Sequence, residues 1–360
     1  MGTVQNRIGD EVLPSVRTTP EATDLQAMFA VMRERHVTAV AMEVSSHALA
    51  LGRVGGTTYD VAVFTNLSQD HLDFHRDLED YFQAKARLFT PELARQAVID
   101  IDDHHGRRLA AASAIPVTTY SALGERSADW RAAEVALGPS GSTFHASGPG
   151  AEVDVAVQLP GQFNVANALA ALVALVSAGV AAETAAAGIA GCPGVPGRME
   201  RVDAGQEFLA IVDYAHTPDA VATLLDALRP VTKGRLVAVL GCGGDRDRAK
   251  RPLMGAAAAG LADVAVLTSD NPRSEDPTAI LDAMAEGARG VPEPERGEVV
   301  VVADRAEAIA LAVSRAGPGD TVVVAGKGHE QGQEAAGVVR PFDDRVALRA
   351  AIEATGRTRS

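Results

Sequence analysis

Cysteine is scarce in this sequence of 360 residues, which contains only Cys192 and Cys242. Two such distant cysteines supply neither a disulfide framework nor a Cys-x-x-Cys metal pair. The chain also lacks any apolar run near the roughly 18 residues of a membrane span, and it does not start with a basic segment followed by an apolar one. From these absences we expect a cytoplasmic protein that has no membrane partner.

Lysine is also rare, with four residues against 29 arginines, although the formal net charge is -14 and the sequence pI is near 5.1. We exclude nucleic acid as the main partner, because binding to phosphates requires clustered basic residues. Where a guanidinium and an amine would serve equally well, this chain uses arginine. A lysine is therefore a candidate for a position that requires a compact amine.

Lys85 is such a lysine, and it follows a predicted buried strand at 61–64. Asp70, His71 and Asp73 come between the strand and a helix that starts near Asp77. Polar groups at the carboxyl end of a buried parallel strand are typical of ligand sites in α/β sheets. The alternative is that Lys85 simply extends from the edge of an amphipathic helix into solvent.

The first half of the chain predicts a mostly parallel α/β sheet. A helix at 21–35, capped by Thr19, precedes a buried strand at 37–44, and further strands are expected at 60–64, 97–101 and 116–120. The acid within the first strand, Glu43, is costly to bury unless it meets a cation or a metal. Two-residue alternation at 128–159 predicts a small β appendage, and two Ala-rich helices follow, up to residue 189.

Glycine and proline are dense at 191–197, which indicates a hinge, so we expect domains at 1–194 and 195–360. The second domain is predicted to be Rossmann-like, with strands near 207–212, 236–240, 264–268, 299–303 and 321–325 separated by helices. Short motifs end three of these strands and should meet at one sheet edge. A nicotinamide site is disfavoured, because Gly241-Cys242-Gly243 lacks the third glycine of GxGxxG.

Ten motifs, taken in order, resemble the Mur ligase family over nearly the whole chain. They are TTP at 18–20, MEVSSHAL at 42–49, TNLSQDHLD at 65–73, the Lys85 helix, FNVAN at 163–167, GRME at 197–200, DYAHTPD at 213–219, GCGGDRD at 241–247, DNPR at 270–273 and GKGHE at 326–330. The resemblance implies a central ATPase domain and a C-terminal Rossmann-like domain. It also implies an amide ligase of cell-wall synthesis, in which ATP phosphorylates a carboxylate and an amine attacks the acyl phosphate.

The resemblance implies a catalytic Mg²⁺ site formed by Glu43, His71 and a carbamylated Lys85. An amine reacts with carbon dioxide only when neutral, so burial that lowers its pKa is required. Carbamylation converts the cation into an anionic oxygen ligand, which suits Mg²⁺. The alternatives are a salt bridge for Glu43 and a capping role for His71.

The remaining site residues follow from the same resemblance. Contacts to a UDP-N-acetylmuramoyl-dipeptide are expected from Thr18, Thr19, Ser45 and Arg53. Contacts to ATP are expected from Asn164, Arg198, Asp213 and His216. Contacts to meso-diaminopimelate are expected from Arg246, Asn271, Arg273, Gly326 and Glu330. For Asn164 the alternative is helix capping.

Two competing hypotheses are a folylpolyglutamate synthase-like ligase and a non-catalytic fragment that only binds a ligand. The second gains weight because the family has a GxxGK[ST]-like phosphate loop ahead of TTP, whereas here 17 residues without lysine precede Thr18. We therefore expect a truncated, monomeric ligase that turns over ATP poorly.

Overall fold

The computed structural model describes residues 1–13, 15, 17–72 and 74–356. Asp73, which was singled out together with Asp70 and His71, therefore lies outside the described residues. The chain divides into two compact units. Unit 1 comprises Met1–Glu134, Phe144–Val155 and Ala166–Gly191, and unit 2 comprises Val135–Thr143, Ala156–Val165 and Cys192–Ser360. Within the described part of the chain, no helix is both long enough and apolar enough to cross a membrane.

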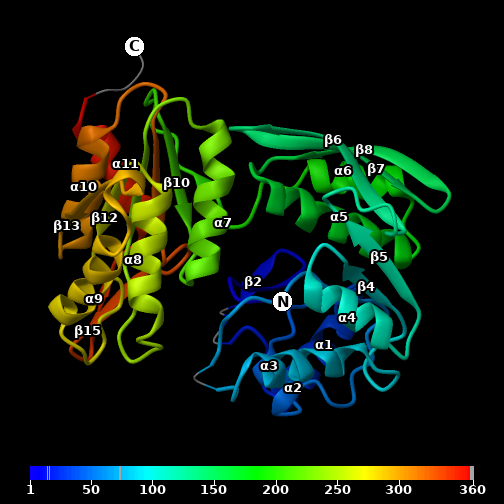
Figure 1. The fold of residues 1–360 in the computed structure, drawn as a ribbon. Helices are drawn as coiled ribbons and strands as arrows, with labels where there is room; N and C mark the ends of the chain where they lie inside the picture. Colours follow the sequence, from blue (N-terminus) through cyan, green and yellow to red (C-terminus); the bar gives the residue numbers. More distant parts are fainter. Residues whose placement is uncertain (14, 16, 73, 357–360) are drawn as a thin grey trace. The chain divides into compact units, whose positions relative to one another are not determined.

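The sheet of the N-terminal half has the strand order β3-β4-β5-β6-β7-β8 (Figure 1). These strands are β3 (Ala62–Phe64), β4 (Ala97–Asp100), β5 (Val117–Ser121), β6 (Trp130–Gly138), β7 (Gly141–Gly148) and β8 (Ala151–Val157). The ladders from β3 to β6 are parallel, and Tyr120 of β5 pairs with Trp130 of β6. The predicted β appendage therefore continues the main sheet instead of forming a separate element. Alternation in the sequence shows strands but not which strand they pair with.

This half of the chain also contains six α-helices within the described residues, and a short hairpin precedes them. The helices are α1 (Ala22–Glu34), α2 (Ser46–Ala50), α3 (Leu78–Ala86), α4 (His104–Ala112), α5 (Gln162–Ser177) and α6 (Ala182–Ala190), and the hairpin strands are β1 (Asn6–Ile8) and β2 (Glu11–Leu13). The Lys85 helix α3 starts near Asp77 as predicted, and Asp77 caps it by accepting from Asp80 N at 2.8 Å. The prediction that Thr19 caps α1 is wrong, because Glu21 is the N-cap residue and its side chain makes no capping bond.

Residues 37–44 form no strand, which contradicts the prediction of a buried strand there. Val40 is 45% exposed, and the Glu43 side chain is also exposed. Backbone bonds join this segment to the start of the chain, since Met1 N donates to Ala41 O and Glu43 N donates to Met1 O. An apolar run becomes a buried strand only where neighbouring strands flank it, and the residues themselves do not specify those neighbours.

Unit 2 contains a six-stranded sheet in the order β13-β12-β11-β14-β10-β9. Its strands are β9 (Glu200–Arg201), β10 (Leu209–Asp213), β11 (Leu236–Leu240), β12 (Val264–Leu267), β13 (Glu298–Val301) and β14 (Thr321–Ala325). All neighbours pair in parallel except β9 with β10. The order reverses between β11 and β14, and in open α/β sheets ligands bind beyond the carboxyl ends of strands at such a point.

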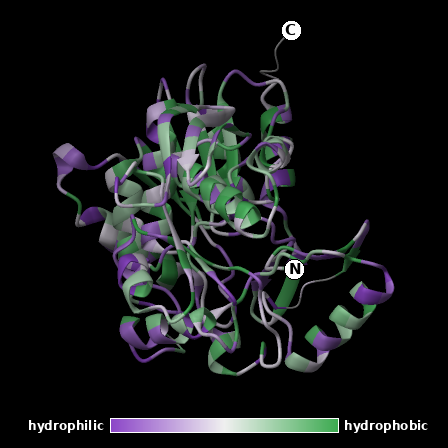
Figure 2. Cartoon of the chain, turned by 90° about the vertical axis from the view of Figure 1, so that its right-hand side faces the viewer, coloured by the Kyte–Doolittle hydropathy of each residue, from purple (hydrophilic) through white to green (hydrophobic). Residues whose placement is uncertain are grey.

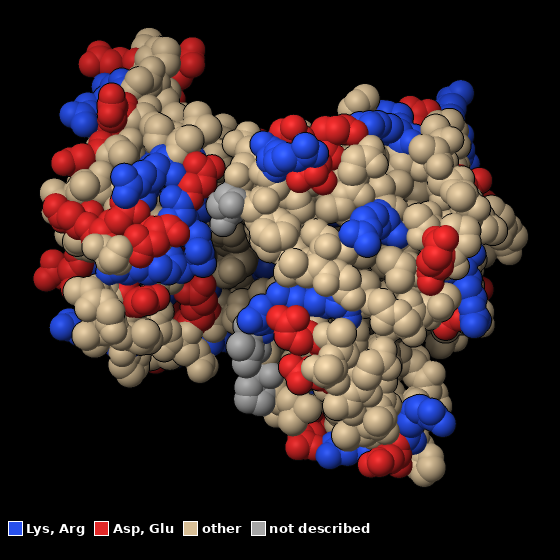
Figure 3. Space-filling model, turned by 90° about the horizontal axis from the view of Figure 1, so that it is seen from below, with Lys and Arg blue, Asp and Glu red and all other residues tan. Residues whose placement is uncertain are grey.

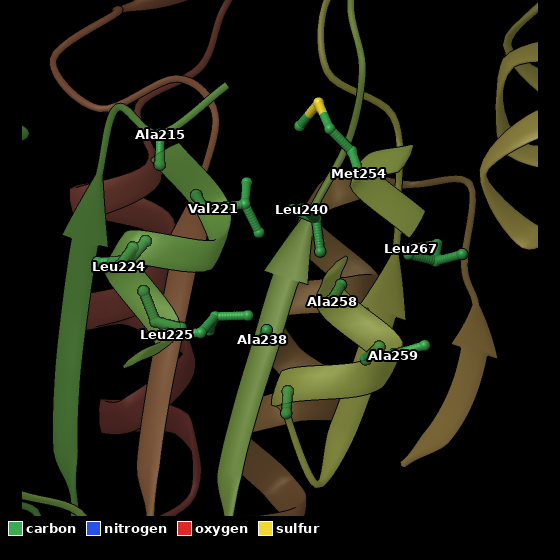
Figure 4. Close-up of a cluster of buried hydrophobic side chains, with 14 of the residues drawn as sticks. Ala215, Val221, Leu224, Leu225, Ala238, Leu240, Met254, Ala258, Ala259 and Leu267 are labelled. Atoms are coloured by element: carbon green, nitrogen blue, oxygen red, sulfur yellow. The ribbon is translucent and has the colours of Figure 1, made fainter. Parts of the chain in front are cut away.

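Alternating side chains of this sheet enter two separate cores. Leu236, Ala238 and Leu240 point to one face, and Val237 and Val239 to the other. The first face is covered by α7 (Pro218–Leu228), α8 (Lys250–Leu261) and α9 (Pro277–Arg289) (Figure 4). The second face is covered by α10 (Arg305–Arg315) and α11 (Asp344–Ala354), and a hairpin of β15 (Gly332–Ala335) and β16 (Val338–Pro341) precedes α11. This mostly parallel α/β architecture confirms the predicted fold class.

The hydropathy of the helices and the distribution of charged side chains on the surface agree with this packing. Apolar and polar segments alternate along the helices (Figure 2), as expected where one stripe packs on a sheet and the other meets water. On the face that Figure 3 shows, acidic and basic side chains are interspersed.

Candidate functional site

In unit 1, hydroxyl groups surround Glu43. Thr3 Oγ1 donates to Glu43 Oε2 at 2.6 Å and lies 3.0 Å from Thr18 Oγ1. Thr19 Oγ1 donates to the Glu43 carbonyl oxygen at 3.0 Å and accepts from Ser45 N at 3.0 Å. The structure thus brings the predicted substrate-binding hydroxyls of Thr18 and Thr19, and the backbone of Ser45, to one predicted metal ligand. Glu43 is exposed, so the burial cost expected for it does not arise.

Arg53 joins the same group through its guanidinium. Its Nη1 donates to the Thr19 carbonyl oxygen at 3.4 Å, and its Nη2 lies 3.0 Å from Glu21 Oε1. The Arg53 side chain is only 10% exposed. Ser45 caps α2 by accepting from Ala48 N at 3.2 Å. A held guanidinium beside several hydroxyl donors is suited to the oxygens of a pyrophosphate or a carboxylate.

His71 adopts a left-handed backbone conformation, with φ of 57°. Its N–H donates to Asp70 Oδ1 at 2.8 Å, and its Nε2 lies 3.6 Å from Asp70 Oδ2. Its ring centroid is 4.8 Å from that of His47 on α2 and 5.8 Å from that of Tyr81 on α3. A left-handed residue other than glycine costs roughly 1–3 kcal/mol, and such residues concentrate at functional sites.

Lys85 is half-buried on α3, and its Nζ lies 5.0 Å from the centroid of the Tyr81 ring. Burial lowers the pKa of the Lys85 ammonium group, and the negative charge of Asp70 partly opposes this effect. Lys85 and His71 therefore approach the same Tyr81 ring. His47 of α2 links this pair to the Glu43 group, because α2 starts directly after Ser45.

The donor set of unit 1 fits a Mg²⁺ ion only if Lys85 is modified. Among the described residues, no group of three or more His, Cys, Asp or Glu side chains gathers closely enough to hold a metal. Glu43 offers carboxylate oxygens and His71 offers an imidazole nitrogen. An unmodified ammonium is not a ligand, whereas a carbamate on Lys85 would add the anionic oxygen that Mg²⁺ prefers.

In unit 2, Asp213 ends β10 and is buried. Its carboxylate accepts from Met199 N at 2.8 Å and from Ala215 N at 2.7 Å. Burial raises the pKa of Asp213. The two backbone hydrogen bonds oppose this shift, and so do the nearby Arg198 and His216 side chains. The carboxylate thereby joins the GRME segment to the loop that follows β10.

Arg198 and His216 both contact Tyr214. The Arg198 guanidinium carbon lies 4.4 Å from the Tyr214 ring centroid, and His216 Nδ1 lies 2.9 Å from the Tyr214 carbonyl oxygen. The structure thus brings three of the four predicted nucleotide residues together. Asn164 lies at the third position of α5 and donates to the Pro160 carbonyl oxygen at 2.7 Å, so it does not cap the helix as the alternative required.

The motifs after β12 and β14 meet at the carboxyl edge of the sheet. Asn271 Nδ2 donates to Glu330 Oε2 at 2.9 Å. Arg273 has a φ of 53°, and its Nη1 donates to the Gly244 carbonyl oxygen at 2.7 Å. Gly326 has a φ of 114°, and a Cβ atom there would lie 2.7 Å from Asp270 Oδ2. Four predicted amino-acid-binding residues lie in these loops or turns, and the fifth, Arg246, is exposed on the neighbouring GCGGDRD loop.

Two features of this edge escaped prediction. Lys327 lies within the GKGHE motif but was given no role of its own, and it is fully buried and bonded to Asn271 and Glu330. Its rarity as one of four lysines could have marked it, as rarity marked Lys85. The β15–β16 hairpin was also not predicted. It contacts a predicted site residue, because Arg273 N donates to Glu334 O and Ala336 N donates to Arg273 O.

The comparisons with known proteins agree with the motifs. The Mur ligase middle domain matches residues 1–175, and the Mur ligase glutamate ligase domain matches 197–328. The UDP-N-acetylmuramoyl-L-alanyl-D-glutamate–2,6-diaminopimelate ligase of Streptomyces coelicolor is 65% identical, over 99% of this chain and 70% of that protein. The ligase of that name from Corynebacterium glutamicum is 52% identical, over 98% and 69%. The chain belongs to the Mur ligase family.

Solved Mur ligase structures extend this similarity to the fold. One of a UDP-N-acetylmuramoyl-L-alanyl-D-glutamate–2,6-diaminopimelate ligase matches with a TM-score of 0.67 and 40% identity, over 99% of this chain and 73% of the other. A folylpolyglutamate synthase from Mycobacterium tuberculosis shares the fold, with a TM-score of 0.59 and 22% identity over 83% and 64%. Mur ligases are acid–amino-acid ligases of peptidoglycan synthesis that use ATP and Mg²⁺, which confirms the reaction class predicted from the motifs.

Proposed function

We propose that this Mur ligase adds meso-diaminopimelate to UDP-N-acetylmuramoyl-L-alanyl-D-glutamate through an acyl phosphate. The observation that supports this most directly is the cluster of Asn271, Arg273 and Glu330 at the carboxyl edge of the unit 2 sheet. The names of the similar proteins from Streptomyces and Corynebacterium point to the same substrates. We also propose that the functional domains are residues 1–194 and 195–360.

The amino-acid site must recognise two chemically different groups. Diaminopimelate has an amino acid head at each end, so one end requires a carboxylate clamp and an acceptor for ammonium. Arg273, with Arg246, supplies guanidinium donors for a carboxylate. Glu330 accepts from an ammonium group, and Asn271 with the Gly326 backbone completes the site.

The unit 1 residues are assigned to the acceptor and the metal. Thr18, Thr19, Ser45 and Arg53 bind anionic oxygens of the UDP-muramoyl-dipeptide. Glu43, His71 and carbamylated Lys85 would hold Mg²⁺, which neutralises charge on phosphate and carboxylate oxygens when bound. The neutral amine needed for carbamylation is favoured by the lowered pKa of Lys85.

Four residues are assigned to the nucleotide, and all four lie within unit 2. Arg198 and His216 offer cationic and donor groups beside the Tyr214 ring, and Asp213 holds the two backbone segments that present them. Asn164 adds an amide at the start of α5. These groups are suited to the phosphates, the ribose hydroxyls and the base of ATP.

Amino-acid competition tests the proposal. Lysine lacks the distal carboxylate that would pair with Arg273, and the loss of this charge-assisted interaction costs on the order of several kcal/mol when the site is closed to water. We expect the chain to bind meso-diaminopimelate at least about a hundredfold more tightly than L-lysine in titration calorimetry. Equal binding, or a preference for L-lysine, contradicts the assignment.

ATP turnover tests the remaining alternatives. Poor ATP turnover stays a prediction, and product analysis with ATP, UDP-muramoyl-dipeptide and diaminopimelate measures turnover directly. Robust ligation contradicts both the hypothesis of an impaired ligase and the hypothesis of a non-catalytic fragment. A thermal shift with folate substrates, without one from the UDP-muramoyl-dipeptide, favours the folylpolyglutamate synthase alternative.

A further inference from the structure

Lys327 is a fully buried lysine that contacts three polar side chains from two loops. Its Nζ lies 3.0 Å from Asn271 Oδ1, 3.0 Å from Glu330 Oε2 and 3.8 Å from Asp270 Oδ1. Burying an ammonium group is costly unless it is paired and hydrogen-bonded. These three contacts meet that requirement, so the position of Lys327 is closely determined by its partners.

The same ammonium group determines how Asn271 and Glu330 are presented. Asn271 Oδ1 accepts from Lys327 and from Glu334 N at 3.0 Å, which leaves the amide nitrogen to donate to Glu330 Oε2. Glu330 Oε2 thus receives two donors from within the protein. Its other oxygen, Oε1, is the better candidate for a ligand, and Lys327 fixes the carboxylate in the orientation that presents it.

The charges around Lys327 are not balanced. Beneath the loops, Arg305 pairs with Asp344 through two bonds of 2.7 Å, and both side chains are fully buried. Arg305 also interacts electrostatically with Asp270 and Glu330. Two cations therefore serve three carboxylates, and one negative charge is in excess. An incoming ammonium group would neutralise that excess in a region where unpaired charge is costly.

We propose that Lys327 is a positioning residue for the amino-acid substrate. It holds Asn271 and Glu330 in the geometry that receives an ammonium group, and it leaves the site one positive charge short until the substrate binds. This inference rests on the proposed function in one respect, namely that the amino acid binds beside Asn271 and Glu330. It does not depend on which diamino acid is bound.

Binding measurements on two ligands test the proposal, because unit 2 also contains the residues assigned to the nucleotide. Titration calorimetry should give the dissociation constants of meso-diaminopimelate, L-lysine and a non-hydrolysable ATP analogue for each variant. We expect Lys327→Met to weaken diaminopimelate binding roughly tenfold to a hundredfold and to change nucleotide binding less than about twofold. The matched control is Lys233→Met, the same substitution at an exposed lysine of the same unit, which should change neither.

The outcomes separate positioning from a merely structural role. Equal loss of both ligands, or unchanged amino-acid binding in folded Lys327→Met, overturns the proposal. If the wild-type chain prefers L-lysine, the proposed function fails, and the positioning role is then judged from the loss of L-lysine binding. If the wild-type chain binds neither amino acid, both inferences fail.

A measurement on the wild-type chain covers the case in which Lys327→Met does not fold. Only four lysines are present, so ¹⁵N-lysine labelling gives few ammonium resonances in NMR. We expect the Lys327 Nζ resonance to shift when meso-diaminopimelate or L-lysine is added to saturation, and the Lys233 resonance to stay in place. A Lys327 resonance that does not move at saturation overturns the proposal.

Discussion

The ammonium group of Lys85 lies 5.0 Å from the centroid of the Tyr81 ring, one helical turn earlier on α3. The imidazole of His71 approaches the same ring, with 5.8 Å between the centroids. Because α3 buries Lys85 beside an aromatic ring, the pKa of its ammonium group is lowered, and the neutral amine forms more readily than at a lysine in water. This relationship leads to the first prediction.

Lys85 should react reversibly with carbon dioxide. We expect ¹³C NMR of the chain equilibrated with ¹³C-bicarbonate to show a carbamate resonance that is absent in Lys85→Ala. Any ligase turnover should fall to background in Lys85→Ala, and acetate should restore part of it by supplying the missing carboxylate. The matched control is Lys233→Ala at an exposed lysine. Undiminished turnover in Lys85→Ala, or a carbamate signal that survives in this variant, would contradict the assignment.

Arg273 should determine selectivity between amino acids. Its backbone is bonded to Glu334 of β15 and to Ala336 just after that strand, and its guanidinium donates to the Gly244 carbonyl, so Arg273 is held in place before a ligand arrives. We expect Arg273→Ala to weaken meso-diaminopimelate binding by roughly 2–4 kcal/mol and L-lysine binding much less. The ratio of the two dissociation constants measures this effect. Arg289→Ala, at an exposed arginine of α9, serves as the control, and an unchanged ratio in Arg273→Ala argues against a carboxylate clamp.

Asp100 at the end of β4 should make stability depend on pH. Burial raises the pKa of Asp100 to about 7 from the usual 3.8. The folded chain therefore holds a proton that the unfolded chain releases, and Asp100 reduces the free energy of unfolding as pH rises from about 4 to about 7. The amide in the Asp100→Asn variant does not titrate. The free energy of unfolding of this variant should therefore increase relative to that of the wild type by about 1–2 kcal/mol over this pH window, after allowance for partial solvent screening.

Urea unfolding of both proteins at pH 4, 5.5 and 7.5 measures this difference. A difference that is constant across the three values would show that Asp100 has an ordinary pKa in the folded chain. Asp60→Asn is a suitable control, because that carboxylate is exposed.

Removing one partner of the buried Arg305–Asp344 pair should cost more stability than replacing both. Arg305 also donates to the carbonyl oxygens of Ser269 and Ala325, so it joins the ends of β12 and β14 to α11. We expect Arg305→Met alone to destabilise unit 2 by about 3–5 kcal/mol, because it leaves an unpaired buried carboxylate. Adding Asp344→Leu should recover part of this loss in chemical denaturation, and strictly additive losses would contradict the coupling.

The sequence predicted those parts of the fold that depend on local pattern. The run at 236–240 is β11 and the run at 321–325 is β14, because each is a continuous apolar segment bounded by polar and glycine residues. The clustering of Asn271 and Glu330 was also predictable, since parallel strands place their carboxyl ends at one edge. In these places local residues and global topology give the same answer.

The failures arose where the answer depends on partners distant in the sequence. The segment 37–44 reads as a strand, but its backbone meets Met1 and not a flanking strand. Trp130 pairs with Tyr120, which no alternation pattern within 128–159 could reveal. Burial of Lys327 likewise depends on Asn271 and Glu330 closing around it, so its role became visible only with the loops assembled.

The strand order of unit 2 also has a consequence for biosynthesis. The central strand β14 lies between β11 and β10, yet it is the last of the parallel strands to be translated. A nascent chain that ends near residue 315 can pair β11 with β12 and β12 with β13, but the facing edges of β10 and β11 still lack β14, their shared neighbour. Such apolar edges pair readily with other chains. We therefore expect ribosome-bound chains to become resistant to protease in this region only after Thr321–Ala325 has emerged, and to depend on chaperones until then.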